Sequence, residues 1–229
     1  MKNLVLIPGL NNTAAVFDGV VAAMPSGVSV HAVTCGALPT VEAIADALID
    51  KLPERFWLGG FSFGGYVALA MLERYPERVA GIAMMCTAPF ADTEAQKEMR
   101  VKAMEKARSG GYKSMIAAQA AHAFHPDSLS NATLMAAREA MVDDYGADRF
   151  VAHMQAVMTR PDRQALLDGS LPTLVMSASH DKVFPPEQVR EYGERIPQAQ
   201  LVCIENAGHL APMEQPDEVA RVLHAWISA

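Results

Sequence analysis

Residues 56–65 of the chain, FWLGGFSFGG, decide its fold. They place Ser62 between two glycines in the pattern G-x-S-x-G, directly after a short apolar run and directly before a helical sequence at 66–72. This pattern predicts a sharp strand-to-helix turn, which strains the serine backbone and admits only small residues two positions away on either side. Gly60 and Gly64 meet that requirement. We therefore expect Ser62 to stand exposed at the carboxyl end of a strand, where the start of the helix favours negative charge.

Apolar runs alternate with amphipathic helical patterns along the chain, which is typical of a parallel sheet covered by helices. The expected strands lie at residues 4–7, 28–33, 56–58, 79–85, 173–176 and 201–204. The expected helices lie at residues 13–24, 41–51, 63–74, 187–195 and 217–227. The predicted fold class is therefore α/β, with a mostly parallel sheet of about six strands flanked by helices.

The alternation of strand and helix fails once, between about Ala88 and Asp168, where the sequence has helical patterns rich in Ala and Met but no convincing strand. We predict that this segment is a helical cap, or lid, inserted over the sheet. The core would consist of residues 1–88 and 168–229, and the cap of residues 89–167. Breaks in the helical pattern are expected at residues 109–111, 125–127 and 145–146, where Gly or Pro occurs.

A serine hydroxyl is a weak nucleophile unless a base takes its proton, so the motif requires a histidine elsewhere in the chain. Of the seven histidines, His209 follows the last expected strand and precedes the final helix, which predicts that it lies at the same sheet edge as Ser62. The base needs an acid on its other ring nitrogen, and Asp181 follows the strand expected at 173–176. These residues predict a serine hydrolase with Ser62 as nucleophile, His209 as general base and Asp181 as the orienting acid. A helix-capping serine, a loop histidine and a turn aspartate are the alternative interpretations.

The motifs resemble those of the α/β-hydrolases, in particular the small cap-bearing esterases related to pimeloyl-carrier methyl ester esterases and to meta-cleavage-product hydrolases. Residues 6–10 are similar to the family's oxyanion loop, 60–65 to its nucleophile elbow, 178–181 to its acid loop and 208–209 to its histidine loop. The resemblance implies that the backbone N–H groups of Leu10 and Phe63 form an oxyanion hole. The family usually has His-Gly where this chain has Pro8-Gly9, so hydrogen bonds from that histidine are absent. The chain starts at what resembles the family's third strand, which implies a sheet of six strands instead of eight.

The pocket is expected to be mostly apolar. Its candidate lining residues are Phe61, Cys86, Phe90, Met154, Met158 and Arg160. Arg160 and Arg163 lie where the insertion returns to the core, and they either bind a substrate carboxylate, tie the hinge or are solvated. The expected activity is hydrolysis of a small to medium, largely apolar carboxylic ester through an acyl-enzyme on Ser62. The alternatives are carbon-carbon bond hydrolysis or lactone opening by the same residues, and a non-catalytic ligand-binding receptor of the same fold.

Composition and charge limit the other classes of function. The hydrophobic fraction of 51% and the charged fraction of 20% are typical of a globular protein. A net charge of −7, without a cluster of Lys and Arg, argues against nucleic acid and membrane surfaces as partners. The three cysteines are widely spaced, so neither a disulfide framework nor a zinc site is indicated. We expect a small-molecule ester as partner, no metal or cofactor, a monomer or homodimer, and the cytoplasm as the compartment.

Overall fold

Six strands form one sheet in which every neighbouring pair is parallel. They are β1 (Lys2–Ile7), β2 (Val28–Ala32), β3 (Phe56–Phe61), β4 (Val79–Met85), β5 (Thr173–Ala178) and β6 (Gln200–Ile204). Their order across the sheet is β2-β1-β3-β4-β5-β6 in the computed structural model, which describes residues 1–229. The predicted α/β class and the six strands are confirmed.

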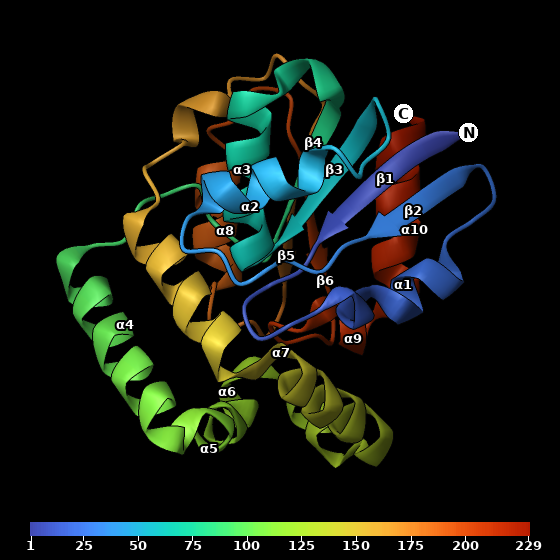
Figure 1. The fold of residues 1–229 in the computed structure, drawn as a ribbon. Coiled ribbons are helices and arrows are strands. Elements are labelled where there is room, and N and C mark those ends of the chain that lie inside the picture. Colours follow the sequence, from blue (N-terminus) through green and yellow to red (C-terminus); the bar gives the residue numbers. More distant parts are fainter.

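Helices cover both faces of the sheet (Figure 1). On one face lie α2 (Val41–Ile49), α3 (Phe63–Arg74) and α8 (Pro186–Gly193), and on the other lie α1 (Asp18–Ala23) and α10 (Pro216–Ser228). Successive residues of a strand point to opposite faces, so Val5 packs into the apolar core beneath α2 and α3 and Leu6 into the core beneath α1 and α10. Because both faces are covered, the central strands are apolar throughout and do not alternate.

Two details of the helices differ from the expectation. The segment at 13–24 forms one turn of 3₁₀-helix at Ala14–Phe17 before α1 begins. A short helix, α9 (Ala211–Glu214), follows His209 and was not predicted, because four residues are too few to show a helical period.

Between β4 and β5 the chain forms only helices. These are α4 (Glu94–Lys106), α5 (Tyr112–Ala118), α6 (Ala120–Ala123) and α7 (Ala132–Thr159), with a one-turn π-helix at Ala107–Gly111 and 3₁₀ turns at Pro126–Ser130 and Gln164–Leu166. Gly110 separates α4 from α5 with a φ of 87°, and Gly146 kinks α7 with a φ of 76°. Glycine adopts these positive angles without the steric cost that a Cβ imposes, which explains why the predicted breaks fall there.

The insertion lies beyond the carboxyl ends of the strands, where Figure 1 shows it in green to gold. It has a small apolar cluster of its own, which includes Met104, Tyr112 and Phe150. The predicted helical insertion is therefore confirmed, whereas the division into core and cap at residues 89 and 167 stays a prediction. None of the helices combines the length and the apolar character needed to cross a membrane.

Candidate active site

Ser62 occupies a strained turn between the end of β3 and the start of α3. Its φ of 52° and ψ of −118° are unfavourable for a residue with a side chain, at a cost of about 1–3 kcal/mol. Hydrogen bonds fix this turn: the Ser62 N–H donates to the carbonyl of Met85 at 2.9 Å, and the Thr87 hydroxyl donates to the Ser62 carbonyl at 2.8 Å. Ser62 is only 8% exposed, so the expected exposed serine is in fact covered, since the insertion lies over this sheet edge.

The two glycines of the motif have no room for a side chain. A Cβ on Gly64 would lie 2.1 Å from the carbonyl oxygen of Ile7, and one on Gly60 would lie 2.5 Å from that of Gly64. Both contacts are with backbone atoms, which cannot move aside as a flexible side chain can. The requirement for small residues on both sides of Ser62 thus has two causes: α3 lies close to the end of β1 at Gly64, and the first turn of α3 lies close to the end of β3 at Gly60.

Ser62, His209 and Asp181 form a continuous chain of hydrogen bonds. The Ser62 Oγ lies 2.9 Å from Nε2 of His209, and Nδ1 of His209 lies 2.8 Å from Oδ2 of Asp181. The other oxygen of Asp181, Oδ1, accepts from the N–H groups of Val183 at 2.8 Å and Phe184 at 2.9 Å, which fixes the orientation of the carboxylate. The three residues follow β3, β5 and β6, so the parallel sheet brings together groups that are distant in sequence.

Two backbone N–H groups beside Ser62 lack acceptors in the protein. Phe63 is the first residue of α3, so its N–H has no acceptor within the helix. The N–H of Leu10 makes no hydrogen bond in its loop. Both residues line the same cavity as Ser62 and His209. These amides can therefore donate to an oxygen that becomes negative next to Ser62.

The cavity that contains Ser62 has a volume of about 650 Å³, and just over half of its lining residues are hydrophobic. Of the residues predicted to line it, Phe90, Met154 and Arg160 do so. The other three do not. Phe61 is fully buried and packs against the ring of His209, because the last residue of β3 points into the core beneath α1 and α10. Met158 packs within the insertion's own cluster.

Cys86, the third predicted lining residue outside the cavity, is sealed in the same core and is 1% exposed. Burial and then the nearby Asp181 carboxylate raise the pKa of its thiol well above the usual value, so the thiol keeps its proton. No group of three or more His, Cys, Asp or Glu side chains is arranged to hold a metal ion.

The comparison with known families decides which fold family this arrangement represents. The profile described as "Alpha/beta hydrolase family" matches residues 4–222, nearly the whole chain. This chain is an α/β-hydrolase. The family predicted from the motifs is therefore confirmed.

Similar α/β-hydrolases include proteins described as esterases. The pimeloyl-[acyl-carrier protein] methyl ester esterase of Aromatoleum aromaticum is 25% identical over 239 residues, which cover 95% of this chain and 95% of that protein. A thermophilic esterase from Thermogutta terrifontis, solved with malate bound, has a TM-score of 0.93 and 27% identity, with coverage of 100% of this chain and 90% of that one. The enol-lactonase from Burkholderia xenovorans LB400 has a TM-score of 0.88 and 23% identity, with coverage of 100% and 92%, and this likeness concerns the fold alone.

In this α/β-hydrolase the insertion holds the loop that follows Leu10. Nη1 of Arg138, in α7, donates to the carbonyl of Asn11 at 2.6 Å and to Oδ1 of Asn12 at 2.8 Å. The Tyr112 hydroxyl, in α5, donates to Oδ1 of Asn11 at 3.1 Å. Asn11 has a positive φ of 61°, so these contacts stabilise a backbone conformation that is otherwise unfavourable. Here the insertion supplies hydrogen bonds to a loop in which Pro8 replaces the histidine usual in the family.

The insertion also contacts the histidine loop. Glu214, in α9, accepts from the N–H of Gly208 at 2.9 Å, from the N–H of His125 at 2.7 Å and from the Ser128 hydroxyl at 2.7 Å. A Cβ on Gly208 would lie 2.6 Å from the backbone nitrogen of His125, so the glycine before His209 permits this close approach.

A third contact joins the insertion to the elbow through His153 of α7. Its ring stacks on that of Phe63 with centroids 4.6 Å apart. Nε2 of His153 donates to the Gly36 carbonyl at 2.7 Å, and the Tyr145 hydroxyl donates to Nδ1 at 2.5 Å. Burial lowers the pKa of His153 from its ordinary value of 6.5 to about 4, so the ring is neutral at pH 7.

Acid should therefore destabilise the fold through His153. Between pH 6.5 and pH 4 the unfolded chain binds a proton that the folded chain does not, so stability falls as pH falls through this range. The difference between the pKa of His153 in the unfolded and in the folded chain corresponds to about 3 kcal/mol of unfolding free energy. Urea unfolding at pH 7 and pH 4 should show that the wild type loses about 3 kcal/mol more than His153→Gln, because glutamine takes up no proton. Any loss of stability that the substitution causes at both pH values cancels, because each protein is compared with itself. If the wild type and His153→Gln lost the same unfolding free energy between pH 7 and pH 4, His153 would not be the group responsible.

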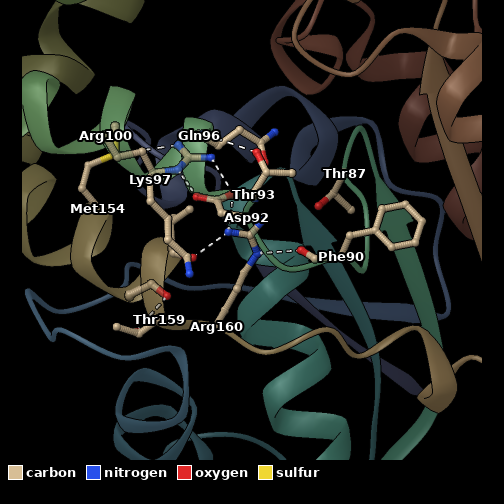
Figure 2. Close-up of polar contacts among 12 residues, drawn as sticks. Thr87, Phe90, Asp92, Thr93, Gln96, Lys97, Arg100, Met154, Thr159 and Arg160 are labelled. Atoms are coloured by element: carbon tan, nitrogen blue, oxygen red, sulfur yellow. Dashed lines mark hydrogen bonds and ion pairs between the residues drawn. The ribbon is translucent and has the colours of Figure 1, made fainter.

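A cluster of charged residues occupies the cavity wall where the insertion joins the core (Figure 2). Nη1 of Arg160 lies 2.9 Å from Oδ1 of Asp92, and its Nε donates to the Phe90 carbonyl at 3.0 Å. Arg100 binds the same carboxylate through Nε and Nη2. Burial works to raise the pKa of Asp92, but the hydrogen bonds and charges of the two arginines outweigh it, and the pKa lies below its usual value. The guanidinium of Arg160 also stacks on Tyr66, 3.8 Å from the ring centroid.

Arg163 does not reach the cavity, although it lies only three residues from Arg160. Nη2 of Arg163 lies 2.5 Å from Glu42 of α2 and 2.7 Å from Glu73 of α3. Its backbone N–H donates to the carbonyl of Pro89 at 3.0 Å, so the outgoing and returning chains of the insertion are neighbours. Arg163 therefore holds the junction between insertion and core to α2 and α3. The guanidinium of Arg160 already contacts Asp92, Phe90 and Tyr66.

Several residues of this region have no signal in the sequence. Arg100, Arg138 and Tyr112 lie in helices of the insertion, and no motif surrounds them. Their positions depend on how the helices pack over the sheet, which local patterns do not specify. The failure of the strand-helix alternation and the resemblance to cap-bearing esterases predict that this segment covers the site, but neither indicates which of its side chains line the cavity.

Proposed function

We propose that the protein hydrolyses a carboxylic ester of small to medium size through an acyl-enzyme on Ser62. The observation that carries this proposal is the hydrogen-bond chain from Ser62 Oγ to His209 and on to Asp181, with distances of 2.9 and 2.8 Å. Ser62 and His209 line a cavity of about 650 Å³, which is a volume suited to a small-molecule ligand. The similar esterases support the choice of an ester.

In the first half of the reaction, Ser62 Oγ attacks the ester carbonyl carbon and its proton passes to Nε2 of His209. The carbonyl oxygen becomes negative and accepts hydrogen bonds from the N–H groups of Leu10 and Phe63. The tetrahedral intermediate then collapses, the carbon-oxygen bond to the alcohol breaks, and His209 gives the proton to the leaving oxygen. The alcohol departs and the acyl group stays on Ser62.

In the second half, a water molecule attacks the acyl-enzyme and gives one proton to Nε2 of His209. Collapse of the second intermediate breaks the bond to Ser62 Oγ, which takes the proton back, and the carboxylic acid is released. Asp181 keeps Nδ1 of His209 protonated in both halves and stabilises the imidazolium that forms. A lactone is a cyclic ester and follows the same steps, so lactone opening is the alternative substrate class for these residues.

A fluorophosphonate probe tests the nucleophile independently of the natural substrate. We expect the wild type to form one covalent adduct, located on Ser62 by mass spectrometry of the peptides. His209→Ala should react far more slowly, because nothing then takes the serine proton. An adduct on Ser26 or Ser177 would point to another site, and the absence of any adduct would favour a ligand-binding role without turnover. A panel of simple esters, a lactone and a vinylogous diketone acid then identifies the bond that is cleaved.

A further inference from the structure

The charge of the cavity has the opposite sign to that of the whole protein. Four charged side chains line it, namely Arg100, Arg138, Arg160 and Asp92, which gives a formal charge of +2, or +1 with the Asp181 carboxylate behind His209, in a chain whose net charge is −7. Walls of low dielectric strengthen such a field inside a cleft. An uncharged ester gains little from this field, whereas an anionic ester is attracted by it.

Arg138 differs from the other two arginines in its partners. Arg100 and Arg160 share the carboxylate of Asp92, so much of their charge is balanced within the cavity wall (Figure 2). Arg138 has no acidic partner, and its hydrogen bonds go only to the neutral groups of Asn11 and Asn12. Both bonds use Nη1. The Nε and Nη2 groups, which form the side of a guanidinium that binds carboxylates in a bidentate manner, make no hydrogen bond in the protein.

A cation in this position is poorly stabilised by the protein alone. Burial lowers the pKa of Arg138 to about 10, so it stays charged at neutral pH. The side chain is half-buried, and Nε and Nη2 remain accessible to a ligand. A bound anion would supply the opposite charge that the protein does not. Asn11 and Asn12 directly follow Leu10, so Arg138 holds the same loop that carries one of the proposed oxyanion donors.

We propose that the substrate is an ester that itself carries a carboxylate, and that Nε and Nη2 of Arg138 bind this carboxylate. The inference rests on the proposed function of Ser62, and it replaces the expectation of a largely apolar ester. Of the arginines that the sequence suggested, Arg163 does not reach the cavity, and Arg160 already uses Nε and Nη1 in contacts with the protein, so neither offers an unpaired Nε and Nη2 edge. Arg138 acts in substrate binding and, through Nη1, also in holding the loop, so an experiment has to separate these two effects.

Half-esters and their neutral methyl esters isolate the effect of the charge. Monomethyl succinate, glutarate and adipate carry the carboxylate on the acyl side, and acetoxyacetate carries it on the alcohol side. The neutral counterparts are the dimethyl esters and methyl acetoxyacetate. We expect the wild type to prefer at least one anionic ester, with a kcat/KM about tenfold to a hundredfold above that of its neutral counterpart, as a charge-assisted bond provides.

Two variants separate binding from positioning. Arg138→Gln removes the charge, and Tyr112→Phe removes a hydrogen bond to the same loop while the charge of Arg138 remains. Arg138→Gln should remove the preference for the anionic ester, mainly through a higher KM. Tyr112→Phe should lower kcat/KM for both esters by the same factor. Thermal unfolding of each variant confirms that it is folded before rates are compared.

Product binding provides a readout that does not require turnover of these esters. Succinate, glutarate and adipate should inhibit hydrolysis of 4-nitrophenyl acetate competitively, and Arg138→Gln should weaken the best inhibitor about tenfold or more. If 4-nitrophenyl acetate is not cleaved, the proposed function fails, and calorimetric titration of the same dicarboxylates into both proteins still tests the binding site. An equal loss on anionic and neutral esters in Arg138→Gln, or dicarboxylate binding that is unchanged by this substitution, would overturn the inference.

Discussion

Ser62→Ala should lower ester hydrolysis by about 10⁴- to 10⁶-fold while the protein stays folded. The substitution removes one oxygen atom, and with it both the proposed nucleophile and the hydrogen bond of 2.9 Å to His209. The rate that remains should come from substrate binding and from the N–H groups of Leu10 and Phe63, the proposed oxyanion donors, which would stabilise attack by water. Hydrolysis of 4-nitrophenyl butyrate, with active-site titration of the wild type, measures the difference.

Alanine fits the turn because the backbone hydrogen bonds of residue 62 do not involve the side chain. The thermal unfolding temperature should therefore stay within a few degrees of that of the wild type, and this measurement is the control. A variant that is folded and hydrolyses the ester within tenfold of the wild-type rate would exclude Ser62 as the nucleophile.

Asp181→Asn should have the second largest effect, a loss of about 10⁴-fold in kcat. Oδ1 of residue 181 accepts from two backbone N–H groups, so asparagine keeps its oxygen there and turns its NH₂ group toward His209. Nδ1 of His209 then has to accept, and the proton moves to Nε2. A protonated Nε2 cannot take the proton of Ser62, so the histidine is held in the wrong tautomer.

Asp50→Asn is the matched control, because Asp50 is an exposed aspartate at the end of α2 without a side-chain partner. It makes the same chemical change on the surface and should leave kcat as it is. Both variants are compared by kcat over a range of pH, and by unfolding in urea. If Asp181→Asn retained more than about a tenth of the wild-type kcat, the orienting role of Asp181 would be wrong.

The sequence predicted the sheet and the placement of Ser62, Asp181 and His209 at one edge, because both depend on local patterns and a topological rule. Runs of apolar residues identify buried parallel strands, and loops after such strands meet at the carboxyl edge. Within the elbow the prediction was less accurate. Phe61 and Phe63 are two residues apart in one motif, yet Phe61 is in the core and Phe63 lines the cavity, since the chain changes from strand to helix between them.

The cavity lining was harder to predict, because it depends on helices that pack across long distances in the sequence. Arg138 contacts Asn11 and Asn12 although more than a hundred residues lie between them. Arg160 and Arg163 occur in one short segment, but a change in backbone direction sends one into the cavity wall and the other to Glu42 and Glu73. Hydrophobic periodicity indicates that such residues are in helices, and does not indicate which partner each one finds.

The hydrogen bond between Pro89 and Arg163 has a consequence for how such a protein changes over evolutionary time. The insertion leaves and rejoins the core at adjacent points. The distance between these two points is therefore set by the core and does not depend on the length of the chain that connects them. The entropic cost of closing a loop grows only slowly with its length, and helices can therefore be added, removed or exchanged here with little effect on the sheet. A lineage can change the helices over the cavity in this way, and so acquire a new ligand, provided that the new helices also supply the hydrogen bonds that now hold the loop at Asn11 and the side chain of Glu214.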